Sequence, residues 1–425
     1  MKGFRHKVIS SPLWLRGIVV TILAFGISWI AVYDIMSVSF FSPMEKAADF
    51  RFSDFYMLVA NDRSVKSLHP SIVVVAVDGC NRREIAAALD DIDYCMPAAV
   101  GLDISFTEPR DTTDDPLAEA IASCDNLVMP VIADETSSER YTIVHSSYYD
   151  RFAQQGTTFA AANIEGEEKA RFTVRDFMPV FRAESGDDIP SLAYALVAKA
   201  SPDIASAVGR RGGKDEALQY SSREFEIIYP EEILGNQESI EGKIVIVGKV
   251  RDAGDLHATP LDNFTPGVMI HAYAAATMLD GDFTGRLTPF ENWLLAAVAC
   301  YLVVLLSLKL ADSLGDLIVR VVQLTTLYIM IIGGVLAYIR LNVDLDFSNA
   351  MLMTSLGVVA SDLFNGIFAD DGVIARSPEI IRRILTYISR ILIHINRLKH
   401  EIYKKFSLNN LNRGSVNNDN SVTGA

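Results

Sequence analysis

The chain is 425 residues long, half of its residues are hydrophobic, and its formal net charge is −15. This length accommodates about two or three domains, and the long middle segment is acidic while both ends are basic, which argues against nucleic acid as its partner. Four cysteines are too few for a scaffold held together by disulfides.

Four apolar runs approach the length of about 20 residues that a helix needs to cross a lipid bilayer. We predict transmembrane helices at residues 17–34, 291–309, 317–339 and 347–369. The first run has the alternative interpretation of a cleaved signal peptide. No small-residue cleavage site follows Tyr33, which favours a retained anchor.

The distribution of lysine and arginine predicts the orientation of these helices. Basic residues concentrate in residues 1–16 and 370–425, and such residues favour the cytoplasmic side of a membrane. An even number of spans places both termini there and residues 35–290 outside the cytoplasm. Arg320 and Asp362 lie where two antiparallel helices would bring them together as an ion pair. The alternative is that Arg320 reaches the lipid headgroups and Asp362 forms local hydrogen bonds.

Short runs rich in valine and isoleucine alternate with helical segments across residues 35–290, which is typical of a largely parallel sheet covered on both faces. The predicted strands are 71–77, 98–104, 126–132 and 243–247, with further strands near 159–164, 172–181 and 225–228. The predicted helices are 43–61, 82–89, 116–123, 190–200 and 267–279. The fold class is therefore α/β, with a mixed, largely parallel sheet and flanking helices, joined to four transmembrane α-helices.

Polar side chains follow three of these strands, and ligands of such sheets gather beyond the carboxyl ends of the strands. If the three strands are neighbours, one edge of the sheet collects acids, a histidine and cations that suit a cation or a small polar ligand. The alternative is that the aspartates only cap turns and helices. The candidate ligand-binding residues are Asp78, Asp103, Glu108, Arg251, Asp255, His257 and Thr259.

Cys95 and Cys124 each precede a predicted strand, so we expect both at the same edge of the sheet. A Cys95–Cys124 disulfide is compatible with this placement in an oxidising compartment. The chain contains no nucleophile elbow, phosphate-binding loop, zinc-protease motif or paired Cys-x-x-Cys. We therefore expect no enzymatic activity, no cofactor and no metal.

Four stretches resemble the type 2 CHASE domain, an extracellular sensory module of bacterial histidine kinases, cyclases and other output enzymes. They are Asp49-Phe50-Arg51, Ile72-Val-Val-Val-Ala-Val-Asp78, Gly101-Leu-Asp103-Ile-Ser-Phe106-Thr-Glu108-Pro109, and Gly242-Lys-Ile-Val-Ile-Val-Gly248 through Asp255-Leu-His257-Ala-Thr259-Pro260 to Pro266-Gly267-Val-Met-Ile-His271-Ala272. The resemblance covers about residues 45–285, and one span before and three after this region are also similar to the family's arrangement. It implies a sensory domain at a bacterial cytoplasmic membrane. It also adds Arg175 to the candidate ligand-binding residues, because the family tends to place an arginine in a central strand.

The chain departs from the family's pattern at two places. The family usually has a Trp-Pro-Trp-Pro-Arg segment after the first strand, and here that region is shortened to Gly79-Cys80-Asn81-Arg82-Arg83, which puts a ligand bound through that loop in doubt. No kinase, cyclase or phosphodiesterase domain follows the last span. A separate cytoplasmic protein would therefore supply the output.

The cytoplasmic tail has isoleucine at positions 381, 388, 395 and 402, which is a seven-residue repeat over about three heptads. Basic residues fill the other faces of this predicted helix. One interpretation is a coiled coil that makes the protein a homo-oligomer. The other is a basic amphipathic helix on the lipids of the inner leaflet.

Together these features predict a membrane-anchored sensor. Its outer domain would bind an unknown small-molecule or protein ligand of the cell envelope, and its spans would relay the bound state to a separate cytoplasmic partner. One alternative is a structural protein that docks other envelope proteins. A weaker one is a metal-dependent envelope enzyme that uses Asp78, Asp103 and His257.

Overall fold

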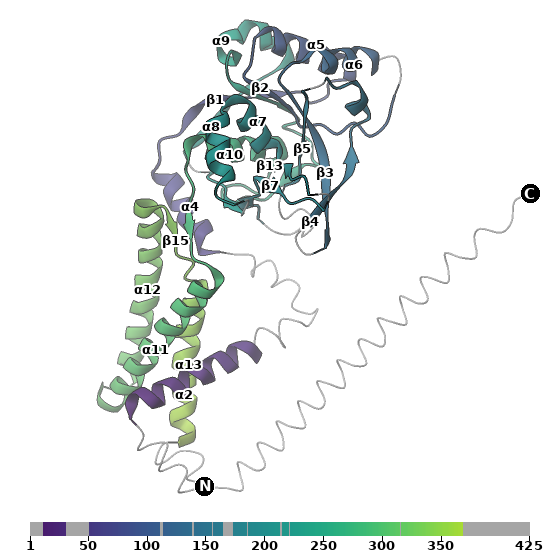
Figure 1. Ribbon diagram of the computed structural model, residues 1–425. Helices are drawn as coiled ribbons and strands as arrows, with labels where there is room; N and C mark the ends of the chain where they lie inside the picture. The colour runs from purple at the N-terminus through teal and green to yellow at the C-terminus, as the bar shows by residue number, and fades with distance from the viewer. Residues whose placement is uncertain are drawn as a thin grey trace, which may run out of the picture. The chain divides into compact units, whose positions relative to one another are not determined.

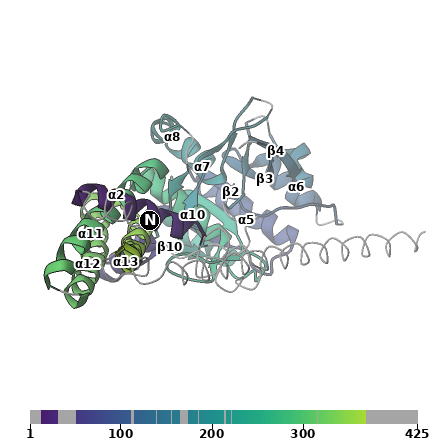
Figure 2. The ribbon, with the colours of Figure 1, turned by 90° about the horizontal axis from the view of Figure 1, so that it is seen from below.

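The computed structural model describes residues 12–30, 51–110, 114–137, 140–154, 156–164, 173–184, 186–212, 215–220, 222–314 and 316–368 (Figures 1 and 2). The chain divides into two compact units. The first comprises Met1–Ala31, Ala297–Leu324 and Leu352–Ala425, and the second comprises Val32–Ala296 and Thr325–Met351. The predicted tail helix and its heptad repeat lie outside the described residues.

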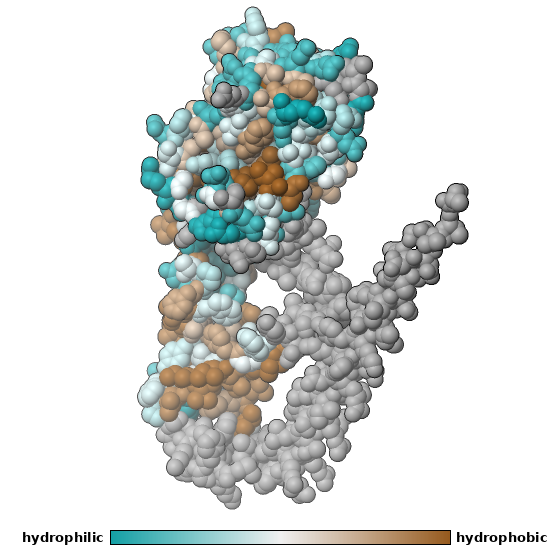
Figure 3. Space-filling view, turned by 45° about the vertical axis from the view of Figure 1, so that its right-hand side comes forward, coloured by the Kyte–Doolittle hydropathy of each residue, from teal (hydrophilic) through white to brown (hydrophobic). Residues whose placement is uncertain are grey.

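Four helices are long and apolar enough to cross a membrane, which confirms the predicted number of spans. They are α2 (Leu13–Ile30), α11 (Pro289–Leu314), α12 (Asp316–Leu341) and α13 (Ser348–Phe368). Their outward-facing apolar side chains give the helices a hydrophobic surface (Figure 3). The helix α2 begins before its predicted span, and α11 and α12 extend beyond theirs at both ends, because a helix continues past the apolar run that predicts it.

Small residues bring the helices of the first unit close together. A Cβ atom at Gly17 would lie 2.6 Å from Leu305 Cδ2, and one at Gly357 would lie 2.9 Å from Cys300 Sγ. Such glycines let helices approach closely inside a membrane. In the same unit Arg320 Nη2 donates a hydrogen bond to Asp362 Oδ2, so the structure brings together the two ionisable residues that the sequence placed as a pair.

The second unit contains a seven-stranded sheet with the order β10-β1-β11-β2-β3-β4, and β5 pairs with β3. All neighbours are parallel except β3 and β4. This confirms the predicted mixed, largely parallel sheet. The strands are β1 (Ser67–Ala76), β2 (Ala99–Leu102), β3 (Leu127–Ser137), β4 (Arg140–Ser146), β5 (Thr158–Ala161), β10 (Arg223–Ile228) and β11 (Ile244–Gly248).

The valine and isoleucine runs supply both layers of the core, because successive side chains of a strand point to opposite faces. In β1, Ile72 and Val74 pack against α7 (Leu192–Ala200) and α10 (Gly267–Asp280). Val73 and Val75 pack on the other face, against α5 (Arg82–Tyr94) and α6 (Asp114–Ser123). Figures 1 and 2 show the strands between these two groups of helices.

Several segments differ from the sequence prediction. The strand expected at 172–181 is two short strands, β6 (Asp176–Phe177) and β7 (Val180–Phe181), each in a small separate sheet. The sequence analysis predicted neither the edge strand β4 nor the helix α8. The remaining elements are α8 (Pro202–Gly209), α9 (Gln237–Ile240), β8 (Ile189–Pro190), β9 (Glu216–Ala217), β12 (Leu256–His257), β13 (Thr265–Pro266) and the 3₁₀ helices Tyr148–Phe152 and Pro230–Asn236.

The carboxyl-terminal part of α12 and the α12–α13 loop belong to the second unit. Hydrogen bonds join them to the rest of this unit. β14 (Gly285–Arg286), which follows α10, pairs in parallel with β15 (Val343–Asp344) in that loop. Tyr338 Oη of α12 donates a hydrogen bond to Gln219 Oε1 over 3.2 Å. We call residues 282–286 together with residues 338–344 the junction.

The helix α4 (Phe52–Arg63) contacts α12 through Tyr56. The described helix begins at Phe52, and the earlier part of the predicted helix 43–61 lies outside the described residues. Tyr56 is fully buried, and its ring centroid is 6.3 Å from that of Tyr338. The Tyr56 ring occupies the space that a side chain at Gly334 would fill, so this glycine sets how closely α4 approaches α12.

Candidate functional site

The three strands whose ends carry the predicted ligand residues are neighbours in the sheet. β11 lies between β1 and β2, with Ala76 beside Gly248 and Val247 beside Leu102. The carboxyl ends of all three strands therefore meet at one edge, as the sequence analysis required. This edge places Asp78 and Asp103 on the two sides of the loop that follows β11.

Asp78 is fully engaged in holding that loop. Its Oδ2 accepts the N–H of Val250 over 3.1 Å, and its Oδ1 accepts the N–H of Arg251 over 2.8 Å. A carboxylate bound to two backbone N–H groups stabilises a turn. Asp78 thus takes the capping role that was the alternative to ligand binding.

The loop from 249 to 266 uses its polar residues mainly on itself. His257 Nε2 lies 3.1 Å from Asp255 Oδ1, and Thr259 Oγ1 lies 3.1 Å from Thr265 Oγ1. A Cβ at Gly267 would lie 2.5 Å from Asp255 Oδ1, so the missing side chain makes room for this carboxylate at the start of α10. Arg251 extends to the hydroxyl of Tyr229, 3.1 Å away.

Asp103 has a partner that the sequence analysis did not propose. His271, near the start of α10, is buried and places its Nε2 3.7 Å from Oδ1 of Asp103, whose side chain is 13% exposed. His271 lies in one of the stretches that resemble the CHASE2 family, but no role was predicted for it. Because α10 is buried on most of its length, a histidine within it gave no local signal that it faces the strand ends.

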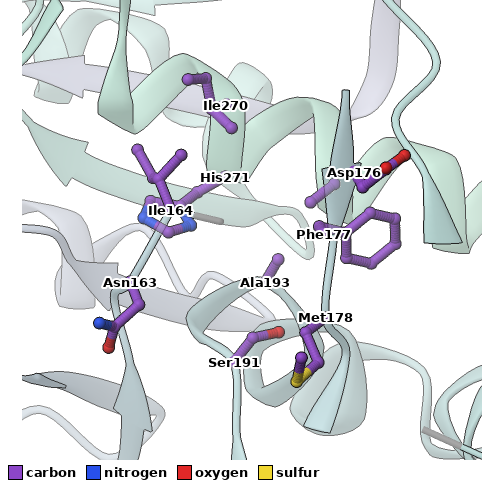
Figure 4. A pocket seen from close by; sticks show the side chains of 10 residues that line it. Asn163, Ile164, Asp176, Phe177, Met178, Ser191, Ala193, Ile270 and His271 are labelled. Carbon is purple, nitrogen blue, oxygen red and sulfur yellow. The ribbon is translucent and has the colours of Figure 1, made fainter. Parts of the chain in front are cut away.

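A pocket lies beside this Asp103–His271 pair. Figure 4 shows the side chains around it, with His271 and Ile164 near one another and Phe177 close to Asp176. The cavity volume is about 20 Å³, and one water molecule needs about 10–15 Å³. The lining residues are Asn163, Ile164, Asp176, Phe177, Met178, Ser191, Ala193, Ile270, His271 and Ala274.

Two polar side chains that line the pocket form hydrogen bonds with the protein backbone. The amide of Asn163 bonds both the N–H and the C=O of Ala133, each over 2.9 Å. Ser191 caps α7 by accepting the N–H of Tyr194. The pocket as it stands accepts a water-sized group next to His271, and a larger ligand has to move α7, α10 or β6.

The buried side chain of Arg82 connects the shortened loop to the backbone of Glu108. Arg82 Nη2 donates a hydrogen bond to the backbone oxygen of Glu108 over 2.6 Å, and its guanidinium lies over the ring of Phe106. The residues of the shortened loop are the start of α5, where Asn81 caps the helix. Arg82 was not a candidate, because nothing in the sequence distinguishes it from Arg83.

Arg175 lies just before β6 and not in a strand of the main sheet. Its Nε and Nη2 donate to the two carboxylate oxygens of Asp54, each over 2.7 Å. Both side chains are buried, with 7% and 12% exposure. This two-point ion pair joins α4 to the segment that leads into the pocket wall, so in the structure Arg175 makes a structural contact.

The cysteines are all free thiols in the structure, so it contains no Cys95–Cys124 bridge. Burial raises the pKa of Cys124 to about 12 and also raises that of Cys95. Both thiols are therefore poor nucleophiles in the folded chain. The oxidised form stays a prediction.

The geometry of these residues does not support the alternative of a metal-dependent enzyme. Among the residues that the structure describes, no three His, Cys, Asp or Glu side chains gather as a metal site. Asp78 accepts backbone N–H groups, whereas Asp103 lies beside His271 and His257 lies beside Asp255.

Comparisons with known proteins identify the family. Searches of curated proteins and of solved structures found no match. The sequence model of the CHASE2 domain matches residues 27–310, which is about two thirds of the chain. This range contains the whole α/β core, the strand-end edge and β14. The chain therefore belongs to the CHASE2 domain family of extracellular sensory domains.

Proposed function

We propose that the protein is a membrane-anchored signal-input protein, whose α/β domain binds a ligand of the cell envelope and passes the bound state to α12 and α13. The observation that carries this proposal is the hydrogen bonding at the junction. Asn342 Nδ2 donates to Asp282 Oδ1 over 2.8 Å, and Thr284 Oγ1 donates to Asn342 Oδ1 over 3.0 Å. The backbone N–H of Gly285 donates to the backbone oxygen of Asn342 over 2.9 Å.

The helix α10 connects the pocket to the junction as one element. Ile270, His271 and Ala274 line the pocket, and Asp282 follows directly after the end of the helix. A helix of this length spans about 20 Å. Because α10 is buried in the core, a ligand that displaces its first turns also shifts Asp282 and β14 against the α12–α13 loop.

Such a signal requires two arrangements of the junction with different affinities for the ligand. The two arrangements would differ in how β14 and β15 pair, and α12 and α13 continue from that pairing as unbroken helices. We place the α/β domain outside the cytoplasm, as the basic ends of the chain indicate. A separate cytoplasmic protein would receive the signal, and the chain itself would catalyse no reaction.

A second candidate is a docking protein without a small ligand. The pocket is small, and the edge strand β4 leaves Ile143 and Val144 about half exposed. Apolar side chains also gather on the face of this unit that Figure 3 shows. An edge strand of this kind is able to pair with another protein. A stable protein complex without any small ligand would favour this alternative.

Thermal unfolding of the full-length protein in detergent, against a panel of metabolites, metal ions and envelope fragments, tests the two candidates. A ligand present at about 100 times its dissociation constant stabilises the folded state by about 2.7 kcal/mol, because it binds that state alone. We expect at least one compound to raise the unfolding temperature of the wild type and to lose this effect with His271→Ala. The control Asp252→Asn lies on the exposed loop and should keep it. An unchanged unfolding temperature across the panel contradicts the small-ligand sensor.

A further inference from the structure

Asp344 is a buried carboxyl group that forms no ion pair within the part of the chain that the structure describes. It is 8% exposed, and its Oδ1 has no hydrogen-bond partner among the described residues. Arg286 stands opposite Asp344 in the β14–β15 register. The guanidinium of Arg286, however, forms its ion pair with Asp176. Burying an ionised carboxylate without a partner is costly, so the neutral acid is favoured at this position.

The positive charges around Asp344 only partly offset the cost of burying its carboxylate. Arg286 of β14 and Arg51 before α4 bring two positive charges near it, but Asp176 of β6 draws on both of them. Asp346 adds a second carboxylate, which caps the start of α13 through Ser348. The uncharged phenols of Tyr56 on α4 and Tyr338 on α12 complete the surroundings, and Asp282 lies farther along the junction.

We propose that Asp344 is a proton-binding site through which pH sets the pairing between the sensory domain and the α12–α13 loop. In the closed junction the carboxyl group is neutral. Loss of its proton to solvent leaves a buried carboxylate, and the cost of keeping this charge away from water favours opening of the β14–β15 pairing. This deepens the proposed function, because it names the proton as an input that acts directly at the junction.

The direction of the pH effect follows from burial. Burial, the largest cause, together with the nearby Asp346, raises the pKa of Asp344 to about 6, although Arg286 opposes the change. An exposed aspartate has a pKa of about 3.9. The closed junction therefore holds the proton more strongly than an open junction, in which Asp344 meets water. Its stability is greatest at low pH and is lost as the pH rises through about 6.

Hydrogen exchange measured by mass spectrometry on the full-length protein in detergent tests the proposal between pH 5 and pH 8. After correction for the pH dependence of intrinsic exchange, peptides covering residues 282–286 and 342–346 should lose about tenfold protection in the wild type, given the two pKa values. Asp344→Asn, which cannot ionise, should keep its protection at pH 8. Asp344→Glu should restore the pH dependence. Asp252→Asn, a substitution in the exposed loop after β11, should behave as the wild type does.

Equal pH dependence in the wild type and in Asp344→Asn would overturn the proposal. If Asp344→Asn does not fold, the comparison of the wild type with Asp344→Glu decides, because a junction controlled by this carboxyl group must change its midpoint pH when the side chain changes. An unchanged midpoint also overturns it. No ligand enters this experiment, so its failure leaves the ligand-sensor proposal standing, and failure of the ligand panel leaves the proton site standing.

Discussion

Replacement of Asp54 by alanine is expected to destabilise the α/β domain by about 3–5 kcal/mol, because it leaves the buried guanidinium of Arg175 without its counter-ion. The two side chains form two hydrogen bonds of 2.7 Å each and are almost excluded from water. The free energy of unfolding of the full-length protein in detergent, measured with a chemical denaturant, checks this value.

Two further variants separate the ion pair from general effects of substitution. Lys66→Ala breaks the pair with Glu224, in which both side chains are more than half exposed, and should cost less than about 1 kcal/mol. The double variant Asp54→Leu/Arg175→Met replaces both charges by apolar groups and should recover most of the lost stability. A cost for Asp54→Ala as small as that of Lys66→Ala would show that the pair does not hold α4 to the domain.

Substitution of Gly334 by leucine is expected to separate α4 from α12. A side chain at this position meets the ring of Tyr56, whose Cε2 is 2.9 Å from the Cβ site and whose outer atoms are closer still. Tyr56 is fully buried between Phe52, Phe55 and Tyr338, so its ring has no free space to enter. Overpacking of this kind costs about 1–3 kcal/mol, which the unfolding temperature of the full-length protein in detergent reports.

The neighbouring glycine supplies the matched control. A Cβ at Gly333 meets nothing within 4 Å, so Gly333→Leu should leave the unfolding temperature nearly unchanged. Adding Tyr56→Ala to Gly334→Leu removes the ring and should restore part of the loss. Equal effects of the two glycine substitutions would exclude close packing of Tyr56 on α12.

The sequence predicts the central strands of the sheet, because continuous valine and isoleucine runs such as 72–77 are typical of parallel strands that are buried on both faces. It also predicts the strand-end edge, because parallel strands carry their carboxyl ends to the same side. The four spans follow from length and apolarity alone. The pairing of Arg320 with Asp362 was one of two alternatives that the sequence left open, and the hydrogen bond between them supports the pair.

The partners of individual polar residues are not predictable in this way. Asp54 and Arg175 are 121 residues apart, and no local pattern relates them. The strands β14 and β15 are two residues each, which is too short for any periodic signal, although they join the domain to the α12–α13 loop. The capping role of Asp78 and a ligand role have the same appearance in a sequence, and only the hydrogen bonds distinguish them.

The proposed function requires the pocket to be coupled to the junction, and a side chain that fills the pocket should reveal this coupling. Ala274 lines the pocket on α10, so Ala274→Leu occupies the cavity as a bound group would. The control Ala120→Leu overpacks α6 in the layer on the opposite face of the sheet. Hydrogen exchange of residues 342–346 in the full-length protein is the readout. We expect Ala274→Leu to change this exchange and Ala120→Leu to leave it unchanged. Unchanged exchange at 342–346 in Ala274→Leu, alongside altered exchange at the pocket itself, would contradict it.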